Sequence, residues 1–276
     1  MKYKTCLILS LLVIGVLVCS NTWASTYMIT TKYPKWSILD YNKSYQGDSL
    51  MCWAYSMANL IDGSGVWGNK DFPNVNYTEI DASQHIVAHY ANEQGSPRAA
   101  WQWWVDGENH QAGGTPAEIG DGGGFWPDIV SGDYDAYTLD LELVIPGIRI
   151  MLQTGYGVAL GIEQASTGAY HWLNAWGYEY ILIPGEDHPA VTGLHITDNE
   201  GGGGPTLDLW NVRYITNPVN SGDTEKRWYI TDQSGAQDWY VSQAVGLRAP
   251  ELPPGAMQMM LLMFGSAFTW VKMRMR

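Results

Sequence analysis

The most informative stretch of the sequence is Gln46-Gly47-Asp48-Ser49-Leu50-Met51-Cys52-Trp53-Ala54-Tyr55-Ser56. The residues from Cys52 onward are small, aromatic or aliphatic, and we expect them to form a helix over about 52–61. The N-terminal end of a helix carries partial positive charge, which stabilises a thiolate. Cys52 is therefore a candidate nucleophile. The alternative is a small apolar side chain buried in the core.

The start of the chain is typical of an exported protein. Residues 1–24 combine a basic start, an apolar run and a small-x-small cleavage site, which is the pattern of a signal peptide. Two of the three cysteines, Cys6 and Cys19, lie in this leader, so the mature chain would keep Cys52 alone. Because exported proteins usually pair their cysteines, a single one is either inert or reactive.

The end of the chain carries a second pattern, over residues 250–276. A proline-rich break precedes an uncharged apolar run at 256–271, and basic residues close the chain. This arrangement resembles bacterial C-terminal protein-sorting signals, and a plain membrane anchor is the alternative. We expect a secreted bacterial protein held at the cell surface or in the membrane, with the membrane or sorting machinery as a partner. Residues 25–249 would form one domain.

The composition argues against nucleic acid as a partner. Hydrophobic residues make up 46% of the chain, charged residues make up 16%, and the net charge is −13. Binding to phosphates needs a basic surface, which an acidic chain does not favour. His85 and His89 have the i, i+4 spacing of a zinc pair, but no third ligand is evident in the sequence. We therefore expect a pair on a helix surface, and no metal or organic cofactor.

The hydrophobic pattern changes character near residue 154. Before it, helices are expected at 52–61, 80–92, 99–104 and, interrupted by a proline, 137–153. After it, runs typical of strands lie at 157–162, 170–178, 194–197, 210–215 and 228–230. A mainly helical N-terminal half followed by an antiparallel, β-rich C-terminal half predicts an α+β fold with two lobes.

Two residues near the ends of expected strands suit a thiol nucleophile. These are His171 and Asp198. A thiol needs a neighbouring imidazole to take its proton, and the imidazole needs a carboxylate or amide to fix its orientation. Cys52, His171 and Asp198 supply these three roles. The alternatives are a histidine satisfied within the core and an aspartate that starts the glycine-rich turn at 201–204.

The chain resembles the papain-like cysteine peptidases in the segment from Gln46 to Ser56. In the papain motif a glutamine precedes the nucleophile by the same spacing, and an aromatic residue follows it. The more specific similarity is to the IdeS/Mac family of secreted bacterial cysteine endopeptidases. It is carried by the glycine-rich segment 153–161, by His171 with Trp176-Gly177, and by Ile196-Thr197-Asp198-Asn199-Glu200. The resemblance covers about residues 42–200.

The resemblance implies a papain-like fold with two lobes and a Cys-His-Asp triad. Cys52 would be the nucleophile, His171 the base, and Asp198 the residue that orients the base. Gln46 would donate a hydrogen bond to the oxyanion. The family's lysine upstream of the cysteine has only an approximate counterpart in Lys43.

A second departure from the family pattern is Glu200, which stands where the family has an aspartate. The sequence predicts an exported cysteine endopeptidase that hydrolyses peptide bonds of a protein or peptide substrate through a thioester acyl-enzyme. One alternative is acyl transfer to an amine by the same triad, as in a transpeptidase or a transglutaminase-like enzyme. The other is a non-catalytic surface binding module.

Overall fold

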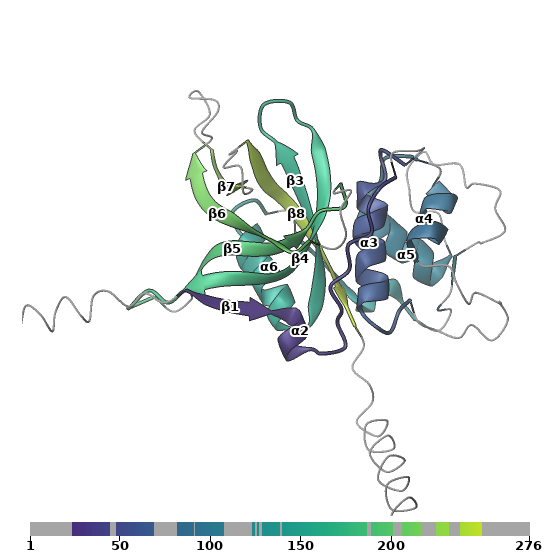
Figure 1. The fold of residues 1–276 in the computed structure, drawn as a ribbon, viewed down its shortest axis with the longest axis horizontal. Coiled ribbons are helices and arrows are strands. Elements are labelled where there is room, and N and C mark those ends of the chain that lie inside the picture. The colour runs from purple at the N-terminus through teal and green to yellow at the C-terminus, as the bar shows by residue number, and fades with distance from the viewer. Residues whose placement is uncertain are drawn as a thin grey trace, which may run out of the picture.

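Antiparallel β-strands form the framework of the fold (Figure 1). The computed structural model of the chain describes residues 24–44, 48–68, 82–90, 92–107, 123–124, 126, 129–138, 140–186, 189–200, 206–216, 225–231 and 238–249. Three predictions fall outside the described residues. They concern the leader up to residue 23, Gln46 as the oxyanion donor, and the C-terminal segment 250–276.

The elements follow one another along the chain in an order that mixes helices and strands. They are β1 (Ser25–Met28), α2 (Ile29–Lys32), α3 (Cys52–Gly63), α4 (Ala82–Tyr90), α5 (Pro97–Asp106), the 3₁₀ turn η1 (Ser131–Asp133), β2 (Asp135–Thr138), α6 (Val144–Gln153), β3 (Tyr156–Gln164), β4 (Tyr170–Ile181), β5 (Ala190–Thr197), β6 (Asp208–Thr216), β7 (Lys226–Thr231) and β8 (Trp239–Arg248).

Six of the described strands close into a barrel. They pair in the order β4-β3-β8-β7-β6-β5, and β5 pairs back with β4. Every pairing in this ring is antiparallel. The 12-residue strand β4 pairs with β3 along its first half and with β1 along its second half. Strand β2 adds to β8. Closure of the ring leaves few unpaired strand edges.

Helix α3 packs directly against the barrel. Ser56 Oγ donates to the carbonyl oxygen of Leu173 on β4 at 2.8 Å, and Asn174 Nδ2 donates to the carbonyl oxygen of Ser56 at 2.9 Å. Asn59 on the same helix donates to the side-chain oxygen of Asn174 at 3.0 Å. In Figure 1, α4 and α5 lie on the far side of α3 from the barrel. The helix is therefore held between the barrel and the other two helices.

The predicted papain-like fold, with a helical N-terminal lobe and a β-rich C-terminal lobe, is wrong. The structure is mostly an antiparallel β-barrel with few helices. The N-terminal half begins with β1, which pairs with β4 of the barrel. The buried apolar residues of α3, α5 and the barrel strands belong to one hydrophobic cluster. Because these elements share one core, they do not divide into two lobes.

Most of the predicted elements are confirmed, with shifted ends. Helix α3 begins at Cys52, as expected, and α4, α5 and strands β3 to β7 fall on predicted runs. The helix expected over 137–153 begins only at Val144, because the chain before it forms β2. Pro146 lies in the first turn of α6, where a missing N–H costs no helical hydrogen bond. In the described part of the chain, no helix is long and apolar enough to cross a membrane.

Candidate functional site

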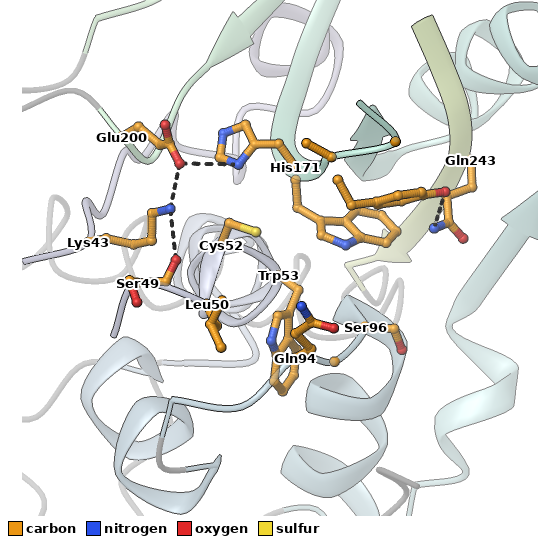
Figure 2. Close-up of a pocket in the computed structure, with 15 residues that line it drawn as sticks. Lys43, Ser49, Leu50, Cys52, Trp53, Gln94, Ser96, His171, Glu200 and Gln243 are labelled. Carbon is orange, nitrogen blue, oxygen red and sulfur yellow. Dashed lines mark hydrogen bonds and ion pairs between the residues drawn. The ribbon is translucent and has the colours of Figure 1, made fainter. Parts of the chain in front are cut away.

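Cys52 is the first residue of α3, so its thiol lies at the N-terminal end of a 12-residue helix. Met51 stands at the cap position, and no cap hydrogen bond from its side chain is present. The N–H groups of a first helical turn have no acceptor within the helix. The N–H of Ala54 donates to the carbonyl oxygen of Met51 at 2.9 Å, so among these groups the N–H of Cys52 is the candidate donor to a group bound beside the thiol. The partly exposed thiol lines a cavity of about 550 Å³ (Figure 2).

His171 lies near the start of β4 and lines the same cavity. The residue is 8% exposed, and its Nε2 lies 2.9 Å from Oδ1 of Asp198, which directly follows β5. The pairing of β4 with β5 brings these two side chains together. The Cys52 thiol lines the same cavity and is close enough to the ring to help raise its pKa. Figure 2 shows the sulfur on the side of the helix that faces the ring. The three residues predicted as a triad are therefore neighbours in space.

The proton affinities of the histidine and the aspartate reflect this pairing. Burial lowers the pKa of His171, but hydrogen bonds with Asp198 and Cys52 and the charges of both partners raise it to about 9. Burial raises the pKa of Asp198, whereas the hydrogen bond and charge of His171 outweigh burial and leave it below its usual value. Imidazolium and carboxylate are thus the favoured forms at neutral pH.

A second ion pair lies beside the first one. Lys43 Nζ is 2.6 Å from Oε1 of Glu200, and the same carboxylate oxygen is 3.6 Å from Nδ1 of His171. The Lys43 side chain is 2% exposed, and Nζ also donates to the carbonyl oxygen of Ser49 at 3.4 Å. Figure 2 shows the ammonium group between Glu200 and Ser49, at the edge of the cavity next to Cys52. A fixed positive charge therefore stands close to the thiol.

Asn199 links the helix of the cysteine to the strand of the histidine. Its Nδ2 donates to the carbonyl oxygens of Cys52 and Trp172, both at 2.9 Å, and the residue is 1% exposed. The backbone oxygen of Asn199 accepts from the N–H of Lys43 at 2.9 Å. The sequence had given no role to Asn199. Its place between Asp198 and Glu200, directly after a strand, was the only signal.

The rest of the cavity wall is a mixture of aromatic and uncharged polar side chains. Leu50 lies just before α3, Trp53 lies in its first turn, and Tyr170 and Trp172 come from β4. Gln94, Ser96 and Gln243 add amide and hydroxyl groups. Apolar walls with a few polar groups are typical of a site that binds an organic ligand. A peptide chain has both apolar side chains and backbone groups that need hydrogen bonds, so this lining suits it.

The sequence predicted that His85 and His89 of α4 lie on the helix surface, but both are buried. His85 and His89 are 6% and 7% exposed. The ring of His89 stacks on Trp103, with centroids 4.3 Å apart and an interplanar angle of 19°. Burial lowers the pKa of His89, which favours the neutral ring. Within the ranges that the structure describes, no group of three His, Cys, Asp or Glu residues could hold a metal ion.

Comparison of the sequence with protein-family models finds no match, and comparison with curated proteins finds none either. The resemblance of residues 42–200 to the IdeS/Mac family therefore stays a prediction. The function has to be inferred from the side chains around Cys52 and from their geometry.

Proposed function

We propose that the protein is a cysteine endopeptidase that hydrolyses peptide bonds with Cys52, His171 and Asp198. One observation carries the proposal. His171 has Asp198 at 2.9 Å on one ring nitrogen and lines, together with the Cys52 thiol at the start of α3, the wall of a cavity of about 550 Å³. A nucleophile, a base and a residue that orients the base are the parts of a thiol hydrolase.

Acylation begins from the ion pair in which His171, as the imidazolium, holds the proton that the Cys52 thiol has given up. The Cys52 thiolate attacks the peptide carbonyl carbon, which forms a C–S bond and places negative charge on the carbonyl oxygen. When the oxyanion collapses, the C–N bond breaks and the departing amine takes the proton from the His171 imidazolium. The products of this step are the free amine and a thioester on Cys52. Asp198 stabilises the imidazolium throughout.

Deacylation repeats the same steps with water. His171 takes a proton from water as the oxygen attacks the thioester carbon. The C–S bond then breaks, the acid product leaves, and the proton on His171 returns to the Cys52 sulfur. If an amine takes the place of water, the same steps give a new amide. Hydrolysis and acyl transfer therefore differ only in the acceptor, and the two outcomes are distinguishable by adding amines to the assay.

The oxyanion needs hydrogen-bond donors in both steps. The backbone N–H of Cys52 is available because it belongs to the first turn of α3. Gln46 remains the donor expected from the sequence. Among the described side chains, the Lys43 ammonium is the candidate for a second donor, since it lines the same cavity and is held by Glu200 at 2.6 Å.

The experiment compares the full-length wild-type chain with Cys52→Ala. Both are incubated with iodoacetamide or with a papain-type epoxide inhibitor near neutral pH, and peptide mass spectrometry maps the modified cysteine. Both are also incubated with a denatured cell proteome, and new peptide ends are counted. We expect modification of Cys52 and new ends with the wild type only. Equal hydrolysis by folded Cys52→Ala would remove the proposal, and circular dichroism serves as the control for folding.

A further inference from the structure

A second cavity, of about 390 Å³, lies at one end of the barrel. Its wall takes residues from all six strands of the ring or from positions directly after them. They are Ile162 of β3, Tyr170 and His171 of β4, Asp198 and Glu200 after β5, Trp210 of β6, Ile230 of β7 and Trp239 of β8, together with Ala169. The open end of a β-barrel is a common place for a ligand pocket. We call this the barrel-end cavity.

The wall of the barrel-end cavity combines two tryptophans and two isoleucines with polar and charged groups. Ile162 and Ile230 are 2% and 1% exposed, while Trp210 and Trp239 are half-buried. Its charged groups are paired with each other or with a neighbour. Asp198 is 2.9 Å from His171, and Glu200 is 2.6 Å from Lys43. The cavity therefore suits a neutral, apolar group better than a charged one.

The barrel-end cavity adjoins the cavity at Cys52. The two share four wall residues, which are Ala169, Tyr170, His171 and Glu200. Only the first cavity includes Cys52, and only the second includes Asp198. His171 thus stands between the nucleophile and the barrel-end cavity. A peptide bound across His171 would contact both.

The chemistry of cleavage decides which part of a substrate enters each cavity. The acyl carbon bonds to the Cys52 sulfur, so the acyl part stays in the first cavity. The departing amine receives its proton from His171, so the segment that follows the scissile bond has to pass over His171. Beyond His171 lies the barrel-end cavity, whose wall includes Trp210 and Trp239.

We infer that the barrel-end cavity binds an apolar side chain, aromatic or long aliphatic, on the leaving-group side of the scissile bond. This inference rests on the proposed peptidase function and adds a substrate preference to it. Trp239, Trp210, Ile162 and Ile230 supply the apolar contact surface. The preference is independent of whether water or an amine completes the reaction.

The test is a cleavage profile with a peptide library randomised on both sides of the scissile bond, using the full-length chain. We expect Phe, Leu, Met and Trp to be enriched, and Asp and Glu to be depleted, at one of the positions directly after the cleaved bond. For a substrate of this kind, Trp239→Ala should lower kcat/KM by about 10- to 100-fold, the range that lost apolar contacts give. Trp210→Ala is the second variant, in case the first does not fold.

Two controls separate the leaving-group side from the rest of the site. A methyl ester of the same acyl part has no side chain after the scissile bond to place in the barrel-end cavity, so Trp239→Ala should lower its hydrolysis far less than that of the peptide. The rate of Cys52 alkylation by iodoacetamide should be unchanged, which shows that the variant is folded. Trp228→Ala is the matched variant, because Trp228 lies on β7 but does not line the barrel-end cavity.

The outcomes distinguish this inference from the proposed function. If the wild type neither cleaves the library nor is alkylated at Cys52, the peptidase proposal itself fails. If the wild type cleaves without preference after the scissile bond, the peptidase proposal stands and the inference is overturned. The inference is also overturned if Trp239→Ala and Trp210→Ala change only the preference before the scissile bond.

Discussion

The side-chain amide of Asn199 donates a hydrogen bond of 2.9 Å to the backbone carbonyl oxygen of Cys52. The same nitrogen donates at 2.9 Å to the carbonyl oxygen of Trp172, the residue after His171. One buried amide thus holds the first residue of α3 against β4 and sets the position of the thiol relative to the imidazole. Asn199 directly follows Asp198, whose carboxylate oxygen Oδ1 lies 2.9 Å from Nε2 of His171. The same short segment therefore contacts both the imidazole and the start of α3.

Asn199→Ala should lower both stability and activity. It leaves two carbonyl oxygens without their buried donor, at a cost of about 1–3 kcal/mol for each. Asn199→Asp should be as harmful, because a carboxylate has no N–H to donate. We expect kcat to fall more than KM changes, since the thiol and the imidazole lose their alignment. Urea unfolding and peptide hydrolysis measure the two effects.

The control for Asn199 is Asn211→Ala, which removes an exposed asparagine from β6. It should leave stability within about 0.5 kcal/mol of the wild type, as is usual for surface substitutions. If Asn199→Ala were as active as Asn211→Ala, the role given to Asn199 in positioning Cys52 would be wrong.

The three triad residues should not contribute equally. His171→Ala should reduce kcat/KM nearly as much as Cys52→Ala, because nucleophile and base act as a unit and their effects are not additive. Asp198→Ala should cost less, since Asp198 only orients and stabilises the ring at 2.9 Å. Steady-state kinetics on one fluorogenic peptide ranks the variants. A loss in Asp198→Ala that exceeds the loss in His171→Ala would contradict the assigned roles.

The activity should fall as the pH rises through about 9. His171 must be protonated to protonate the departing amine, and its hydrogen bonds with Asp198 and Cys52 outweigh burial and raise its pKa to about 9. In Asp198→Asn the negative partner is gone, so the alkaline limb of kcat/KM should move to lower pH. The pH profiles of the two proteins provide the measurement. If the alkaline limb of kcat/KM lies at the same pH in both proteins, Asp198 does not raise the pKa of His171.

The same pKa predicts a change in stability with pH. An unfolded histidine titrates near 6.5, whereas folded His171 has a raised pKa of about 9. The folded state therefore binds the proton more tightly, and this stabilisation is complete below about pH 6.5 and is lost as the pH rises through about 9. Between these values Tm should fall more in the wild type than in His171→Gln. Equal falls would show that other groups cause the loss.

The sequence predicted the local features of this site better than the fold around it. The helix that begins at Cys52 and the strands that carry His171 and precede Asp198 followed from short patterns of apolar, aromatic and small residues. Strand β8 was missed, although it pairs with β2, β3 and β7. The closure of β4 with β5 was missed as well. Strand β8 and the pairing of β4 with β5 both depend on contacts between distant parts of the chain. A local pattern of apolar residues carries no information about such contacts.

Asn199 and Lys43 show the same limit within the site. The donor role of Asn199 depends on two carbonyl oxygens that belong to α3 and β4, so it becomes visible only when these elements are placed together. Lys43 was noted only as an approximate match to a family residue. Its pairing with Glu200, at 2.6 Å, joins two parts of the chain far apart in sequence.

The last prediction concerns the charge next to the thiol. If Lys43 donates to the oxyanion, Lys43→Met should lower kcat about 10²- to 10³-fold, the usual loss for one oxyanion donor. Gln46→Ala should then lower kcat less than Lys43→Met does. If Gln46 is the donor instead, Gln46→Ala should cause the larger loss of kcat. Alkylation of Cys52 by iodoacetamide proceeds through no oxyanion, so its rate should change little in either variant. Lys226→Met removes an exposed lysine from β7 and is the matched control.

Glu200→Gln separates a direct role of Lys43 from a structural one. Its amide oxygen can still accept from the Lys43 ammonium, so hydrolysis should persist, whereas Glu200→Ala releases the ammonium and should raise KM or lower kcat. Glu200 is 45% exposed but the Lys43 side chain is only 2% exposed, so Glu200→Ala leaves a buried ammonium without its carboxylate and should lower Tm, whereas Glu200→Gln keeps an acceptor and should lower Tm less. An equal loss of hydrolysis and of Cys52 alkylation in Lys43→Met would show that Lys43 supports the thiolate rather than the oxyanion.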